Sequence, residues 1–194
     1  MIRLPRRLSA AAVIGATAAI AATPALAHPG HPGQEDFGAW AGLLHPFTGL
    51  DHVLAMAAVG LWAARLGRRA WATWPATFLA AMAIGFNLPA FDPVGLEVGV
   101  LASVILLGAF TALERRGGET CGMAVVGVAG LLHGMAHAAD IGRAAPTFEL
   151  GMLTATAILI CTGLGLGLAL RGGGLVRWLG AAVAASGLVM AVAR

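Results

Sequence analysis

Uncharged stretches of about 20 residues, the length needed to cross a bilayer core, recur along this chain and constrain its fold more than any other feature. Of its 194 residues, 59% are hydrophobic and only 11% are charged, whereas a soluble domain carries about 25% charged residues. The mean hydropathy is +0.85. The 28 glycines and many alanines suit close packing of helices in lipid. The composition therefore predicts an all-α integral membrane protein without a separate soluble domain.

The first 27 residues differ from the rest and predict a cleavable signal peptide. Three arginines in residues 1–9 precede an apolar, alanine-rich stretch, and Ala25 and Ala27 occupy the small-residue positions before a cleavage site. Cleavage after Ala27 would leave a His-rich periplasmic tail over 28–36 and a transmembrane domain over 37–194. An uncleaved first helix is the alternative, and both versions place His28 on the outer side.

Six apolar blocks follow the tail, and each is predicted to cross the membrane as a helix. Polar or Gly/Pro-rich breaks separate them, and Asn87 before Pro89 favours unwinding at the end of the second block. The expected spans are 49–66, 70–90, 94–113, 121–139, 147–170 and 174–193.

The arginines support one orientation of these six helices. With the tail outside, the outer side holds only Arg143 and Arg194 of the transmembrane domain, and this bias follows the positive-inside rule. The inner ends and loops hold seven arginines, namely Arg65, Arg68, Arg69, Arg115, Arg116, Arg171 and Arg177. The N-terminus is therefore expected on the outer side, where all six histidines also fall.

Several function classes lack the residues that they need. The 12 basic residues are all arginines at segment ends, so no basic run for nucleic acid is present. The absence of lysine excludes a P-loop and a Schiff base, and neither Ser103 nor Ser186 lies near a histidine. The protein is therefore not expected to be an enzyme. Cys121 and Cys161 lie in apolar segments and are interpreted as small buried packing residues.

The motif "LLHGMAHAADIG" places polar side chains on one stripe of the fourth expected helix. His133, His137 and Asp140 are spaced i, i+4 and i+7, so they share a face. Two imidazoles about 6 Å apart on one helix face can bind the same metal ion. They could instead bond only each other or backbone carbonyls, but ionisable groups at membrane depth are costly and usually functional.

The motif "HPFTGLDH" brings His45, Asp51 and His52 to the start of the first expected helix. A straight helix would hold the two histidines about 10 Å apart along its axis. Pro46 and Gly49 favour another geometry, with His45 on a non-helical or re-entrant segment folded back over a helix that begins near Gly49. Asp51 is either a direct metal ligand or a residue that orients a histidine, and a capping role is the structural alternative.

Five further residues are weaker candidates for the entrance or the surroundings of this metal site. One methionine lies a turn below His52, two glutamates begin inward-running helices, and two histidines lie in the "HPGHPG" tail. They are Met56, Glu97, Glu149, His28 and His31.

These two motifs resemble those of the HupE/UreJ family of nickel/cobalt permeases. "HPFTGLDH" is similar to the H-x5-D-H pattern of that family, and "LHGMAHAAD" is similar to F-H-G-x-A-H-G-x-E. The second motif differs at Leu132, Ala138 and Asp140, where the shorter Asp140 keeps the charge of glutamate but reaches less far. The resemblance extends over essentially the whole chain and implies a metal-site role for His45, Asp51, His52, His133 and His137.

The resemblance implies uptake of Ni²⁺, or Co²⁺, across the bacterial inner (cytoplasmic) membrane for hydrogenase or urease maturation. The ion would be transported rather than permanently bound, and its ligand chemistry does not choose between the two metals. Two alternatives remain open: a membrane subunit that binds b-type haem between histidines of two helices, and an accessory protein that binds metal without transporting it. The oligomeric state, the coupling ion and the metalloenzyme supplied also stay open.

Overall fold

The computed structural model describes residues 38–89, 92–113, 119–141, 146–170 and 174–193. Within these ranges all regular structure is helical, and the predicted signal peptide and His-rich tail lie outside them. The elements are α2 (Ala39–Leu44), the 3₁₀ helix η1 (His45–Phe47), α3 (Leu50–Leu66), α4 (Ala70–Phe86), α5 (Pro93–Leu113), α6 (Glu119–Ile141), α7 (Pro146–Ala169) and α8 (Leu175–Val192).

The six long helices α3 to α8 coincide with the six predicted blocks, with one clear difference. Helix α4 ends at Phe86, before the predicted end at residue 90. Asn87 terminates it, because the Asn87 side chain donates a hydrogen bond to the Ala83 carbonyl at 3.0 Å and Pro89 cannot continue a helix. The predicted unwinding before Pro89 is therefore confirmed.

Four helices are long and apolar enough to cross a membrane, judged by length and composition. They are α5, α6, α7 and α8, and a fifth span results if the bent pair formed by Ala39–Phe47 and Leu50–Leu66 counts as one. Helices α3 and α4 have 17 residues each, or about 25 Å, slightly less than the core of a typical bilayer. The described residues thus form a helical membrane protein with four or five candidate spans, and the predicted sixth span remains a prediction.

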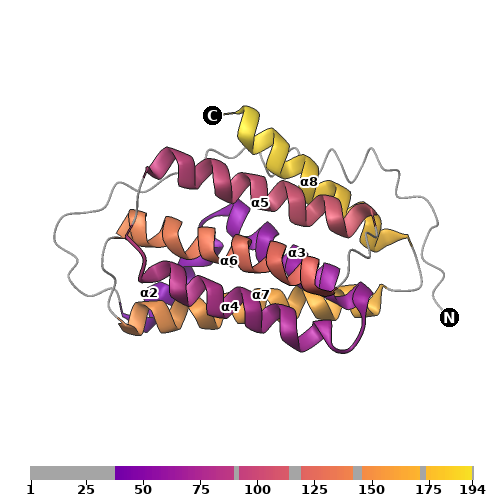
Figure 1. Ribbon diagram of the computed structural model, residues 1–194, viewed down its shortest axis with the longest axis horizontal. Helices are drawn as coiled ribbons and strands as arrows, with labels where there is room; N and C mark the ends of the chain where they lie inside the picture. The colour runs from indigo at the N-terminus through magenta and orange to yellow at the C-terminus, as the bar shows by residue number, and fades with distance from the viewer. Residues whose placement is uncertain (1–37, 90–91, 114–118, 142–145, 171–173, 194) are drawn as a thin grey trace.

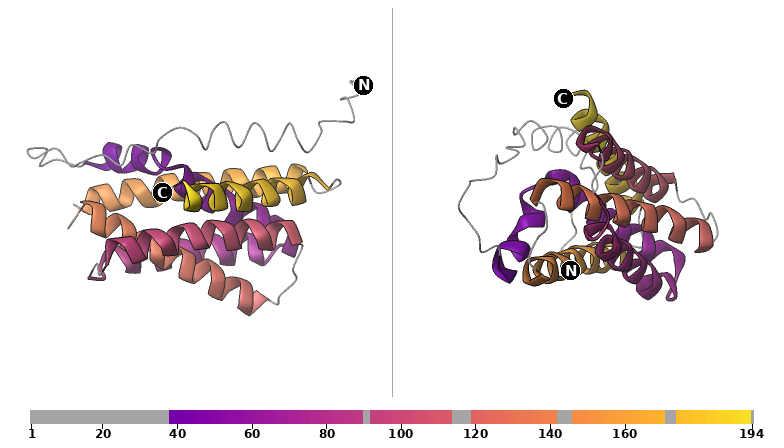
Figure 2. Two further views of the ribbon diagram at one scale, coloured as in Figure 1. Left: turned by 90° about the horizontal axis from the view of Figure 1, so that it is seen from above. Right: turned by 60° about the vertical axis from the view of Figure 1, so that its left-hand side comes forward.

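Successive long helices alternate in direction and pack as an elongated bundle (Figures 1 and 2). Helix α4 packs along α6, α5 along α8, and α3 along α7, while the short α2 packs against the start of α7. As a result, the starts of α3, α5 and α7 gather at the same end of the bundle as the last turns of α4 and α6 (Figure 1). Both histidine motifs lie at that end.

Glycines allow the closest helix pairs to form. A Cβ added at Gly134 of α6 would meet the carbonyl oxygen of Met82 in α4, and one added at Gly108 of α5 would meet the backbone of α8 at Gly180 and Ala184. Close approach of small residues is the usual source of helix association in lipid.

Large apolar side chains lie both inside the bundle and on its outer surface. Met56, Trp74 and Phe78 are fully buried, whereas Val98 and Ile158 are exposed, as expected for side chains that face lipid. Cys121 and Cys161 are also exposed, so the interpretation of both as buried packing residues is wrong. A thiol behaves as a small apolar group, so an apolar sequence around it does not distinguish a lipid-facing position from a core position.

Candidate metal-binding site

The chain enters helix α3 through a sharp bend that positions His45. The pair α2–η1 lies at 85° to α3, a bend that fits either a broken span or the predicted re-entrant segment. The local conformation differs from the prediction, because His45 is helical, with φ −56° and ψ −46°. Proline is tolerated directly after it because Pro46 lies in the first turn of the short 3₁₀ helix η1, where its missing N–H is not needed. Thr48 stabilises the turn by donating its hydroxyl to the His45 carbonyl at 2.7 Å.

Gly49 is the point at which the direction of the chain changes. Its backbone is extended, with φ −110° and ψ 119°, and it precedes the first residue of α3. A Cβ at this position would lie 2.7 Å from an Asp51 carboxylate oxygen and 2.9 Å from Nδ1 of His52. Glycine therefore leaves the space in which these two side chains meet.

Asp51 holds the imidazole of His52 in one orientation. The carboxylate oxygen Oδ1 lies 2.7 Å from Nδ1 of His52 and also accepts the His52 backbone N–H at 2.9 Å. An ionised carboxylate can only accept, so Nδ1 carries the proton and the lone pair of this ring is on Nε2. That Nε2 is buried and has no hydrogen-bond partner among the described residues.

The second motif presents another histidine in the same tautomer. His133 lies in α6, is fully buried and places Nδ1 at 2.8 Å from the Ala129 carbonyl oxygen. A carbonyl accepts, so Nδ1 is the donor and Nε2 again has the free lone pair. Within the described ranges this Nε2 is also buried without a hydrogen-bond partner, as are both ring nitrogens of His137, one helical turn further along. Metal-binding imidazoles commonly have one nitrogen fixed in this way by a second group.

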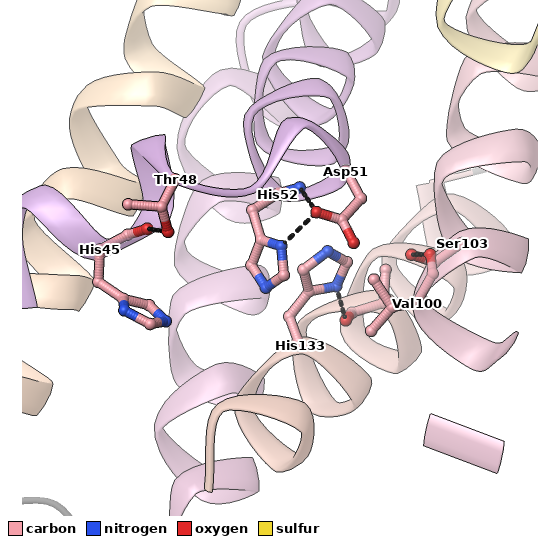
Figure 3. Close-up of polar contacts among 8 residues, drawn as sticks. His45, Thr48, Asp51, His52, Val100, Ser103 and His133 are labelled. Atoms are coloured by element: carbon pink, nitrogen blue, oxygen red, sulfur yellow. Dashed lines mark hydrogen bonds and ion pairs between the residues drawn. The ribbon is translucent and has the colours of Figure 1, made fainter. Parts of the chain in front are cut away.

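The rings of the two motifs meet inside the bundle. The ring centroid of His52 lies 5.0 Å from that of His133 and 4.4 Å from that of His137. The ring centroid of His45 lies 5.1 Å from that of His137. Figure 3 shows His52 and His133 side by side, with Asp51 bonded to His52. Residues separated by about 80 positions in the sequence thus form a single imidazole cluster of His45, His52, His133 and His137.

The imidazole cluster is not a finished coordination shell. Within the described residues, no three His, Cys, Asp or Glu side chains are arranged so that they hold one ion. The rings meet edge to face or at a tilt, with interplanar angles of 50° to 77°. The arrangement therefore offers neighbouring pairs of nitrogen donors, and bringing three donors to one ion needs rotation of the side chains.

The other predicted site residues have different surroundings. Met56 is fully buried one turn after His52, Glu97 is exposed near the start of α5, and Glu149 is half-buried in the first turn of α7. Asp140 lies in the last turn of α6, but its side chain is outside the described residues, as are His28 and His31.

Three phenylalanines that the sequence did not single out surround the imidazole cluster. The ring of Phe78 lies 5.7 Å from that of His133, Phe86 lies 6.2 Å from His137, and Phe148 lies 5.6 Å from His45. Phe78 and Phe86 are eight residues apart, about two helical turns, so their shared face was the available sequence signal. These rings exclude water and strengthen electrostatic interactions at the unpaired nitrogens.

Comparisons with known proteins find a family and a relative that match most of the chain. Residues 16–190 match the family described as HupE / UreJ protein. The chain is 38% identical to protein HupE of Rhizobium leguminosarum bv. viciae over 158 residues, which cover 79% of this chain and 82% of that protein. No solved structure matches the chain significantly.

Proposed function

Because this chain belongs to the HupE/UreJ family, we propose that it is a secondary transporter for divalent transition-metal cations, with Ni²⁺ as its main substrate and Co²⁺ as the alternative. Proteins of this family are transporters or accessory proteins rather than enzymes. The ion is the cargo of the protein, and its delivery would serve the maturation of a hydrogenase or a urease.

The imidazole cluster is the observation that carries this proposal. Three of its members, His52, His133 and His137, have buried ring nitrogens without hydrogen-bond partners in the described part of the chain. Leaving such groups unpaired in a membrane protein is unfavourable, and a cation that accepts their lone pairs removes the cost. Imidazole with carboxylate suits Ni²⁺ and Co²⁺, and incomplete donor pairs bind weakly enough to release the ion.

The proposed direction of transport follows from the predicted topology. We propose six crossings in the bacterial inner membrane, a cleaved signal peptide and a periplasmic N-terminus, which put the imidazole cluster at the periplasmic end. The inner end then carries Arg65, Arg68, Arg69 and Arg177, as the positive-inside rule requires. Labelling of Thr48→Cys, but not of Arg68→Cys, by an impermeant thiol reagent in intact cells would support this orientation. Both variants need the Cys121→Ala, Cys161→Ala background.

Each residue of the site has a proposed role. His45 receives the ion from the tail residues His28 and His31, and His137 passes it to His52 and His133. Asp51 fixes the orientation of His52, and Asp140 adds a carboxylate at the outer end of α6. Met56, Glu97 and Glu149 lie along the approach or beside the cluster and have smaller roles.

Uptake by proteoliposomes tests the proposal. Radiolabelled Ni²⁺ should enter vesicles that contain the wild-type protein, with Co²⁺ as a competitor, and His52→Ala or His133→Ala should abolish uptake. Ser186→Ala is a matched control, because Ser186 is a buried polar side chain of α8 with no hydrogen-bond partner among the residues that the structure describes. Unchanged uptake by both histidine variants would contradict the proposal.

The same preparation separates the two alternative functions. Metal binding without uptake would indicate an accessory protein, and a Soret band in the purified protein would indicate haem. The direct contacts between the rings favour a small cation, because the two axial histidines of a haem lie on opposite faces of a porphyrin.

A further inference from the structure

Below the imidazole cluster, helices α3 and α4 contribute buried side chains to a common core. Helix α3 continues from His52 through Met56 to Trp62, and α4 contributes Trp74, Phe78 and Met82 at intervals of four residues. Met56, Trp74, Phe78 and Met82 are fully buried, and Trp62 is 2% exposed. All five belong to the same core cluster. Along α3 the order from the outer end is therefore imidazole, thioether and indole, and along α4 it is thioether, phenyl and indole.

Three aromatic rings from three helices close this axis near its inner end. The ring of Trp62 in α3 stacks on that of Phe110 in α5, with centroids 5.0 Å apart and an interplanar angle of 6°. It also meets Trp74 of α4 at 4.4 Å and 72°. Trp62 follows His52 by ten residues, or about 15 Å of helix. The three residues Trp62, Trp74 and Phe110 are called the aromatic cluster below.

The aromatic cluster contains two buried indole N–H groups. Nε1 of Trp62 and Nε1 of Trp74 are both buried, and neither has a hydrogen-bond partner among the described residues. Buried tryptophans usually find a partner for this N–H, because leaving it unpaired is unfavourable. The two donors lie in adjacent rings, so a hydrogen-bond acceptor that reached either ring would stabilise it.

Helix α6 provides the room that the aromatic cluster needs. The six-membered ring of Trp74 lies against Gly122, where an added Cβ would overlap it. On the outer side, Phe78 lies between the tryptophans and His133, one turn from Trp74 along α4. The imidazole cluster and the aromatic cluster are thus two ends of one continuous row of side chains.

We propose that the aromatic cluster is the inner gate of the cation pathway, an inference that rests on the proposed transport function. Its rings block the route to the inner surface while the ion binds to the imidazoles. When the rings separate, water reaches the two indole N–H groups and satisfies them, and the π faces attract the passing cation. The gate acts on any small hydrated cation, whereas the imidazole cluster determines which metal is captured.

Passive leak through proteoliposomes tests the gate. Vesicles loaded with a dye that divalent ions quench receive Mn²⁺, which imidazole sites bind weakly compared with Ni²⁺. Trp62→Ala should raise Mn²⁺ entry about tenfold or more over wild type, a factor equivalent to about 1.4 kcal/mol of barrier height. Ni²⁺ binding to the purified variant should remain unchanged, because no ring of the imidazole cluster is altered.

Controls separate the gate from a general loss of packing. Trp178→Ala removes an indole that is 55% exposed on α8 and should leave Mn²⁺ entry at the wild-type rate. Trp62→Phe keeps a ring in the stack and should leak less than Trp62→Ala. If Trp62→Ala does not fold, the milder Phe110→Leu takes its place and should still leak more than wild type.

The outcomes also separate the gate from the transport function. Wild-type rates of Mn²⁺ entry in folded Trp62→Ala and Phe110→Leu would overturn the gate while wild-type Ni²⁺ uptake still supports transport. Raised Mn²⁺ entry in these variants, combined with no Ni²⁺ uptake by the wild type, would support a cation pathway closed by these rings and overturn Ni²⁺ as the transported ion.

Discussion

Two helix pairs in this bundle use glycine in the same way but carry different side chains. In the α4–α6 pair Gly134 meets the backbone of α4 at Met82, and in the α5–α8 pair Gly108 meets the backbone of α8 at Gly180. Only the first pair presents histidines, with His133 and His137 on either side of its contact glycine. Close packing alone therefore does not create a site; the site arises where close packing buries groups that need a partner.

The largest expected effect comes from enlarging the two contact glycines. Gly134→Val should separate α6 from α4, displace His133 and His137, and lower Ni²⁺ affinity by a large factor. Gly108→Val should lower stability by a similar amount, about 1–3 kcal/mol, and leave Ni²⁺ affinity per folded molecule unchanged. Thermal unfolding together with titration calorimetry measures both quantities. Equal losses of affinity in the two variants would show that the α4–α6 contact has no special relation to metal binding.

The next effect concerns the carboxylate that orients His52. Asp51→Asn keeps the size of the side chain but removes its charge and the preference for one ring tautomer. Loss of such an orienting partner lowers metal affinity by about 10- to 100-fold. Asp92→Asn is the matched control, since Asp92 caps α5 by accepting the backbone N–H groups of Val94 and Gly95. Calorimetric titration with Ni²⁺ should show a loss in the first variant only.

A pH series distinguishes the imidazole cluster from the aromatic cluster. Only neutral imidazole binds a cation, so Ni²⁺ uptake is expected to fall once acid protonates the rings and to recover as the pH rises. Mn²⁺ leak through Trp62→Ala should not change over the same range, because the aromatic cluster contains no group that titrates there. Uptake assays in buffers of constant ionic strength measure both, and a parallel fall would argue against separate functions for the two clusters.

The smallest effect is expected at the inner end of the α4–α6 pair. Arg69 forms an ion pair with Glu119 at 3.1 Å, but the Arg69 side chain is 81% exposed. Exposed pairs contribute about 0–1 kcal/mol, so Arg69→Gln should lower the free energy of unfolding only slightly and leave Ni²⁺ uptake unchanged. Chemical denaturation with the uptake assay checks both. A large loss of uptake would mean that the inner ends of α4 and α6 affect the site directly.

The helix positions were predictable because hydrophobic length is a local property of the sequence. The predicted block 49–66 became Leu50–Leu66, and 94–113 became Pro93–Leu113. The meeting of the two histidine motifs was also predictable, since alternating crossings bring the start of one helix to the end of another. The predicted conformation of His45 was wrong, because a residue before proline is usually extended and here the end of α2 overrides that preference.

Other parts of the site could not be predicted, because they depend on contacts between residues far apart in the sequence. The proton positions on His52 and His133 follow from a neighbouring carboxylate and a backbone carbonyl. The aromatic cluster joins Trp62, Trp74 and Phe110 from three helices, and each of these looks like an ordinary apolar residue in its own segment. The exposure of the two cysteines was likewise not predictable from the composition of their segments.

The amino-acid sequence alone determined that this protein is a bundle of apolar helices with the histidines of its two motifs near one end, because helix length and the spacing of polar residues depend only on neighbours along the chain. The tertiary structure decided which helices touch, which ring nitrogens stay unpaired and which rings close the opposite end. Those features depend on side chains from remote segments that compete for the same small volume, and only the packed bundle determines how that volume is shared.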